Sequence, residues 1–199
     1  DMGGTHAFTL VVTAIIFGRV VGLLGEIPTG VIGDHLGRKK AIVIGMVLNS
    51  AAFLVRVWIV FNDSLVQSFS LALLSYFLTN IGAALKSGTV EAWIVDSIRE
   101  LKTSEGHTTI FAQMTSNMQI TRLMGATLGL ALFFNGFIYL AFSLGAFASL
   151  LCAIYCGFLM KETTTIPFYK GELFVRESME KMKHILATGY LISIRVKTV

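Results

Sequence analysis

Residues 30–40 read Gly30-Val31-Ile32-Gly33-Asp34-His35-Leu36-Gly37-Arg38-Lys39-Lys40, and they follow a long apolar run. The glycines near the end of that run allow helices to approach each other closely. Asp34 ends the apolar run, Gly37 permits a tight turn, and three consecutive basic residues come next. The stretch therefore predicts the end of one membrane-spanning helix, a short charged loop and the start of another helix.

The composition is that of a membrane protein. Of the 199 residues, 54% are hydrophobic and only 14% are charged, and the mean hydropathy is +0.73. A soluble domain carries about 25% charged residues. Because the apolar residues are grouped in long runs, most of the surface is expected to face lipid. The predicted fold is all-α, a polytopic transmembrane helix bundle.

Five apolar runs are long enough to cross a hydrocarbon core of about 30 Å at about 1.5 Å per residue. They lie at about 8–32, 41–61, 65–98, 110–134 and 136–160, and together they make a transmembrane domain over 1–160. The third run stays uncharged only to Leu85, so its helix is expected to pass the membrane face. Residues 161–199 are predicted to be a cytoplasmic linker, with an amphipathic helix that lies either on the membrane surface or in solvent.

Basic residues are distributed unequally between the two sides of the predicted bundle. Of the 16 lysines and arginines, four lie in or near the spans, and the other 12 lie in 34–40, in 99–109 or after 160. Basic connections stay in the cytoplasm, so we expect the N-terminus outside and the C-terminus inside a cell membrane, as in the bacterial inner membrane. The net charge of +4 follows from this asymmetry and does not indicate nucleic-acid binding.

The sequence gives no sign of an enzyme. No Ser/His/Asp grouping, metal-ligand set or phosphate-binding glycine loop is visible, so neither a cofactor nor a bound metal is expected.

The stretch from Gly30 to Lys40 resembles the signature of the loop between helices two and three of the major facilitator superfamily. That signature reads Gly, three residues, Asp, a basic residue, any residue, Gly, Arg and further basic residues. Residues 87–97, Ser-Gly-Thr-Val-Glu-Ala-Trp-Ile-Val-Asp-Ser, look like the cytoplasmic end of helix four in that family. The resemblance implies a partial major facilitator fold: helices two to six and the start of the central linker, without helix one and the C-terminal half.

The resemblance also implies a function, namely secondary active transport of a small solute by alternating access, driven by a gradient of protons or another ion. No proline follows Gly125 and Gly129, in contrast to helix five of many drug/proton antiporters, so drug export is not implied. The alternative is a non-transporting membrane scaffold or a truncated half-transporter, because five spans alone cannot form a cavity between two halves.

In this family the loop signature gates the inner face. By resemblance, the gating residues are Gly30, Asp34, Gly37, Arg38 and Lys39. An acidic residue at the inner end of helix four pairs with the loop arginine, so Glu91 or Asp96 is expected to pair with Arg38 and to latch the inner face shut.

Charged residues inside the spans are the candidates for transport, because each costs about 3 kcal/mol at the centre of a bilayer. The candidate substrate or coupling-ion residues are Arg19, Glu26, Asn80, Gln119 and Arg122. Arg19 and Glu26 are about two helical turns apart and share a face. If the arginines serve the solute, an anionic substrate is favoured; alternatively, Glu26 neutralises an arginine and holds helices together. Arg56 lies toward the outer end of its span, can snorkel to the interface, and is assigned no function.

Overall fold

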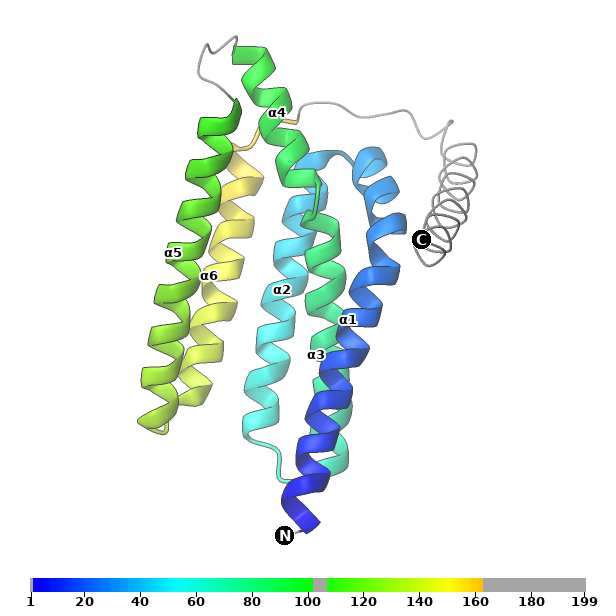
Figure 1. Ribbon diagram of the computed structural model, residues 1–199, viewed down its shortest axis with the longest axis vertical. Helices are drawn as coiled ribbons and strands as arrows, with labels where there is room; N and C mark the ends of the chain where they lie inside the picture. Colours follow the sequence, from blue (N-terminus) through cyan, green and yellow to red (C-terminus); the bar gives the residue numbers. More distant parts are fainter. Residues whose placement is uncertain (1, 102–106, 163–199) are drawn as a thin grey trace, which may run out of the picture.

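The computed structural model describes residues 2–101 and 107–162, and every element in them is a helix (Figure 1). The helices are α1 (Met2–Leu36), α2 (Arg38–Val60), α3 (Leu65–Lys86), α4 (Thr89–Leu101), α5 (His107–Phe134) and α6 (Ile138–Leu159). The predicted all-α bundle is confirmed. The amphipathic helix expected after Met160 lies outside the described residues.

Four stretches of the described chain are long and apolar enough to cross a membrane: Phe8–Glu26, Arg38–Val60, Leu65–Ile98 and Ile138–Leu159. Large apolar side chains cover much of the outer surface, as Phe158 and Val66 illustrate with 85% and 75% exposure. Such a surface is stable against lipid and unstable against water. The chain is therefore a multi-pass membrane protein. Helix α5 is not among the four stretches because it carries more polar side chains, so its crossing of the membrane stays a prediction.

The helices lie side by side in the order α1, α3, α2, α6, α5 (Figure 1). Helices α2 and α3 touch backbone to backbone: a Cβ atom added at Gly45 or at Gly82 would lie 2.7 Å from the carbonyl oxygen of the other glycine. Helix α6 is held against α2 by the Ser50 hydroxyl, which donates to the Ala146 carbonyl at 2.8 Å. Helix α5 packs mainly against α6 and forms the outer edge of the row.

Two glycines with positive φ divide the chain at one end of the bundle. Gly37 has φ of +95° and separates α1 from α2, as the expected tight turn requires. Gly88 has φ of +71° and separates α3 from α4, so the single helix predicted over 65–98 is two helices in the structure. After the break, α4 runs beyond this end of the bundle at an angle to α3 (Figure 1).

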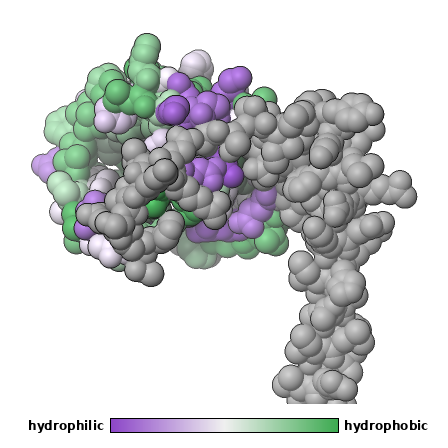
Figure 2. All heavy atoms as spheres, turned by 90° about the horizontal axis from the view of Figure 1, so that it is seen from above, coloured by the Kyte–Doolittle hydropathy of each residue, from purple (hydrophilic) through white to green (hydrophobic). Residues whose placement is uncertain are grey.

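The start of α2, helix α4 and the chain after α6 gather at the same end, opposite the start of α1 (Figure 1). Figure 2 shows the molecule from that end: hydrophobic residues dominate the left of the view, and hydrophilic residues gather near its middle. The basic loop and α4 thus share one end of the bundle, which the positive-inside rule predicts to be cytoplasmic.

Candidate functional site

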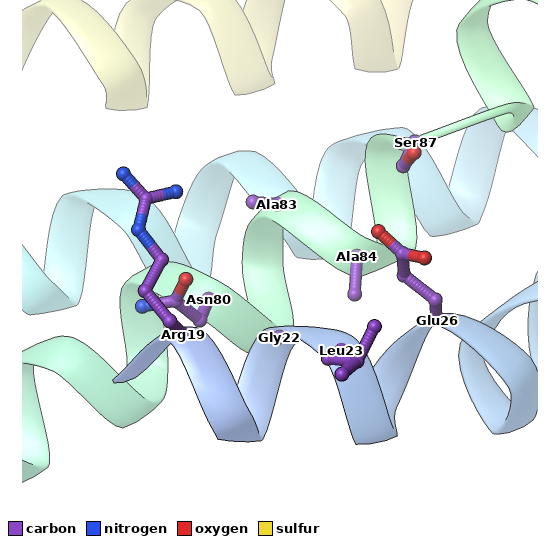
Figure 3. Close-up of a pocket in the computed structure, with 8 residues that line it drawn as sticks. All are labelled: Arg19, Gly22, Leu23, Glu26, Asn80, Ala83, Ala84 and Ser87. Atoms are coloured by element: carbon purple, nitrogen blue, oxygen red, sulfur yellow. The ribbon is translucent and has the colours of Figure 1, made fainter. Parts of the chain in front are cut away.

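A pocket of about 340 Å³ lies between α1 and α3 (Figure 3). Its lining residues are Arg19, Gly22, Leu23, Glu26, Asn80, Ala83, Ala84 and Ser87. Three of the five predicted substrate or coupling-ion residues therefore line one pocket. The face of α1 that was expected to carry both charges and glycines is the face that lines it.

Glycines on α1 make room for Asn80. A Cβ atom at Gly18 would lie 2.7 Å from Asn80 Nδ2, and one at Gly22 would lie 3.1 Å from Asn80 Oδ1. The Asn80 amide in turn donates to the carbonyl of Tyr76 at 2.8 Å, one turn earlier on α3. Larger residues at the two glycine positions would push α1 away from α3, so the pocket depends on this close approach.

The two charged residues of the pocket stand apart from each other. In Figure 3, the Glu26 carboxylate points toward Ser87, and the Arg19 guanidinium points away from it. Both side chains are exposed, and within residues 2–101 and 107–162 neither forms an ion pair. The alternative in which Glu26 neutralises an arginine is not realised among these residues.

The oxygen atoms of the pocket define its chemistry. Glu26 contributes a carboxylate, Asn80 an amide oxygen and Ser87 a hydroxyl. Hard cations take such oxygen ligands, whereas the planar donors of Arg19 suit a carboxylate or another oxyanion. The lining can thus hold a cation and an anionic group at separate points.

Gln119 and Arg122 lie elsewhere. Both are exposed on α5, and α5 contributes no lining residue to the pocket. The structure therefore separates these two predicted residues from Arg19, Glu26 and Asn80.

The expected pair at the signature loop is present. The Arg38 guanidinium forms an ion pair with Asp96 of α4 and donates to the Ala92 carbonyl at 2.8 Å. The resemblance left Glu91 and Asp96 as alternatives, and the structure pairs Arg38 with Asp96, while Glu91 is exposed. Four-fifths of the Arg38 side chain and a similar part of the Asp96 side chain are buried. Gly30 and Asp34 lie in α1, and the structure does not describe the surroundings of these two residues.

Residues 161 and 162, which follow α6, are hydrogen-bonded to both α2 and α4 next to this ion pair, and the sequence did not indicate these bonds. Glu162 accepts a hydrogen bond from the Lys39 backbone N–H at 3.3 Å, and Trp93 Nε1 donates to the Lys161 carbonyl at 2.9 Å. Acidic side chains near a helix N-terminus are stabilising. The start of α2, helix α4 and residues 160–162 are therefore bonded to one another in a ring. The one available sign of these bonds in the sequence was Trp93, in the segment 87–97 that resembles the cytoplasmic end of helix four.

Arg56 does not snorkel, so that expectation was wrong. Its Nε and Nη2 atoms donate to Ser75 Oγ and Thr79 Oγ1, both at 2.8 Å. Both hydroxyls lie near the middle of α3 (Leu65–Lys86). Because a helical side chain leans toward the N-terminus of its own helix, Arg56 of α2 reaches into the membrane and not toward the nearer interface.

Comparisons with known proteins point to transport. No family model matches the chain, and no solved structure matches it. The chain is 27% identical over 190 residues to a Na(+), Li(+), K(+)/H(+) antiporter from Planococcus maritimus, and the alignment covers 96% of this chain and 40% of the antiporter. The chain thus spans well under half the length of this relative. Together with the membrane-length helices, the similarity indicates a membrane transporter and does not distinguish the major facilitator superfamily from other transporter families.

Proposed function

We propose that the chain is part of a secondary transporter of the major facilitator type, which exchanges protons for a small solute by alternating access. The observation that carries the proposal is the Glu26 carboxylate, which faces the pocket between α1 and α3 without an ion-pair partner in the described residues. A carboxylate at membrane depth is costly unless it has a role. Binding a proton or a cation neutralises it, which is the elementary step of exchange.

The similarity to a cation/proton antiporter supports a monovalent cation as the exchanged solute. Glu26 and Ser87, at one end of the pocket (Figure 3), offer oxygen ligands of the kind that a cation takes, and Asn80 lies about two helical turns away. Because a proton and a cation compete for one carboxylate, binding of one promotes release of the other. Arg19 favours an anionic solute in the same pocket, and the ion dependence of exchange separates the two classes.

In this proposal the ion pair of Arg38 and Asp96 is the inner gate. It ties the start of α2 to α4 beside the pocket's Ser87 end. Asp34, Gly30 and Lys39 belong to the same gate by their place in the signature loop.

The test uses the full-length protein that contains this chain, reconstituted in vesicles with a pH-sensitive dye inside. Addition of Na⁺, Li⁺ or K⁺ should dissipate an imposed pH gradient. Glu26→Gln should abolish this response, while Asp63→Asn, which neutralises an exposed carboxylate in the turn between α2 and α3, should retain it.

Two results contradict the proposal in different ways. Normal cation-driven proton movement in Glu26→Gln would remove Glu26 from coupling. Proton movement driven by an organic anion and lost in Arg19→Gln would keep the transporter and replace the solute class.

A further inference from the structure

Arg56 is the centre of a polar cluster that joins three helices within the membrane. Its guanidinium is bonded to the hydroxyls of Ser75 and Thr79, and Ser75 is 1% exposed. The Ser75 hydroxyl in turn donates to the Ala52 carbonyl of α2 at 3.3 Å. Side chain and backbone of α2 are therefore both fixed to the same turn of α3.

Two aromatic rings flank the guanidinium. Its carbon lies 5.0 Å from the centre of the Phe53 ring and 5.8 Å from the centre of the Tyr76 ring, which are cation–π distances. Phe53 also reaches α6, because a Cβ atom at Gly145 would lie 3.0 Å from its ring. The guanidinium is thus held between α2 and α3, and the Phe53 ring links it to α6.

The cluster is continuous with the pocket. Tyr76 packs against α1, where a Cβ atom at Gly18 would lie 3.0 Å from the Tyr76 Cβ atom. The Tyr76 carbonyl accepts the hydrogen bond that orients the Asn80 amide. Thr79, which Arg56 holds from the α2 side, is the neighbour of Asn80 in the chain. Arg56 therefore holds the turn of α3 that directly precedes Asn80, the first of the α3 residues that line the pocket.

An arginine at this depth is costly, and no carboxylate among the described residues pairs with it. A hydrocarbon side chain could fill the same space at lower cost, so packing alone does not account for it. Five fixed donors in one plane, in contrast, set both the rotation and the depth of a neighbouring helix.

We propose that Arg56 is a positioning residue of the pocket: it fixes the rotation and depth of α3, and through them the place of Asn80 beside Arg19 and Glu26. Its effect on transport rests on the proposed function, whereas its effect on the pocket does not. Arg56 touches no lining residue of the pocket by its own hydrogen bonds and acts through Ser75, Thr79 and Tyr76.

The experiment reads the pocket directly. A cysteine replaces Ala83, an exposed lining residue, in full-length protein without other reactive cysteines, and its rate of alkylation is measured in membranes. Arg56→Lys keeps the charge but cannot bond both hydroxyls and stack on two rings. We expect it to change the alkylation rate several-fold. In transport it should lower kcat/KM by about 10- to 100-fold, the size of effect that a displacement of about 1 Å produces.

Thr79→Val removes the single hydrogen bond between Arg56 and Thr79, and it replaces Arg56→Lys in the experiment if that variant does not accumulate in the membrane. It should change the alkylation rate in the same direction as Arg56→Lys. Ser70→Ala is the matched control, because the Ser70 hydroxyl donates only to Val66 of its own helix and is exposed. Unchanged alkylation and unchanged transport per folded molecule in Arg56→Lys, or in Thr79→Val where that variant is used, would overturn the inference. Absence of exchange in the unmodified protein would refute the proposed function and leave the alkylation comparison to decide on Arg56.

Discussion

Neutralising Asp96 should open the end of the bundle at which α2 and α4 meet. In the structure, the Arg38 guanidinium is shared between the Asp96 carboxylate and the Ala92 carbonyl of α4. Asp96→Asn keeps the size of the side chain and removes its charge, which leaves the arginine with one neutral acceptor in place of a carboxylate. The contact between α2 and α4 is weakened without a cavity being formed.

The magnitude follows from the burial of the pair. Exposed ion pairs contribute about 0–1 kcal/mol, and breaking a buried one costs about 3–5 kcal/mol. The Arg38 and Asp96 side chains are 20% and 23% exposed, between these limits, so we take the loss as about 2 kcal/mol. If the pair exists only when this end is closed, the ratio of open to closed molecules rises by about 30-fold, since about 1.4 kcal/mol corresponds to a factor of ten.

Alkylation of a cysteine placed at Thr89 measures this shift, because Thr89 is only 8% exposed and lies on the face of α4 that carries Ala92 and Asp96. The rate in Asp96→Asn should rise by up to about 30-fold. Exchange of the two charges, Arg38→Asp with Asp96→Arg, should restore part of the protection. Glu91→Gln, an exposed carboxylate on the same helix, should leave the rate unchanged. Equal acceleration by Asp96→Asn and Glu91→Gln would refute the reasoning, since a general loss of negative charge on α4 would then explain both.

Two further predictions concern packing and transport. Gly45→Ala should destabilise the protein by about 1–3 kcal/mol in a detergent unfolding assay, because the new Cβ atom would lie 2.7 Å from the Gly82 carbonyl oxygen. The control Gly157→Ala should be neutral or slightly stabilising, because its Cβ atom would meet nothing within 4 Å. Equal effects of the two substitutions would contradict the close contact of α2 and α3. Arg122→Ala should abolish transport by the full-length protein at unchanged abundance in the membrane, and normal uptake by this variant would exclude Arg122 from the mechanism.

Local patterns in the sequence predicted the parts of the structure that local forces decide. Hydropathy located the helices, because a run of apolar residues long enough to cross a membrane satisfies its own backbone only as a helix. The spacing within residues 30–40 located the turn at Gly37, and helical periodicity placed Arg19 and Glu26 on one face. The acidic partner of Arg38 was narrowed to two residues on one helix, and only the observed rotation of α4 chose Asp96.

Contacts between helices far apart in the chain were beyond prediction. The direction of Arg56 depended on hydroxyls at two positions of α3, and nothing in the sequence around Arg56 indicates them. The break at Gly88 was missed, because the polar residues from Lys86 to Glu91 were interpreted as a helix that continues past the membrane face. Gln119 and Arg122 were grouped with the pocket by their charge and depth, yet their helix packs at the far edge of the row. Sequence reasoning gives which residues are costly in a membrane, whereas packing decides which of them meet.

The break at Ser87 and Gly88 connects the two features on which the proposed transport depends. Ser87 lines the pocket opposite the Glu26 carboxylate (Figure 3), and the helix that follows the break carries Asp96. Gly88 has positive φ, and the Thr89 hydroxyl donates across the break to the Leu85 carbonyl at 2.9 Å. In alternating access, one helix bundle rocks or gates against the other around a fixed binding site. The Glu26 carboxylate points toward Ser87, the residue before Gly88 (Figure 3), and the ion pair of Arg38 and Asp96 lies about two helical turns beyond that break, so one short segment of the chain connects the proposed site to the proposed gate.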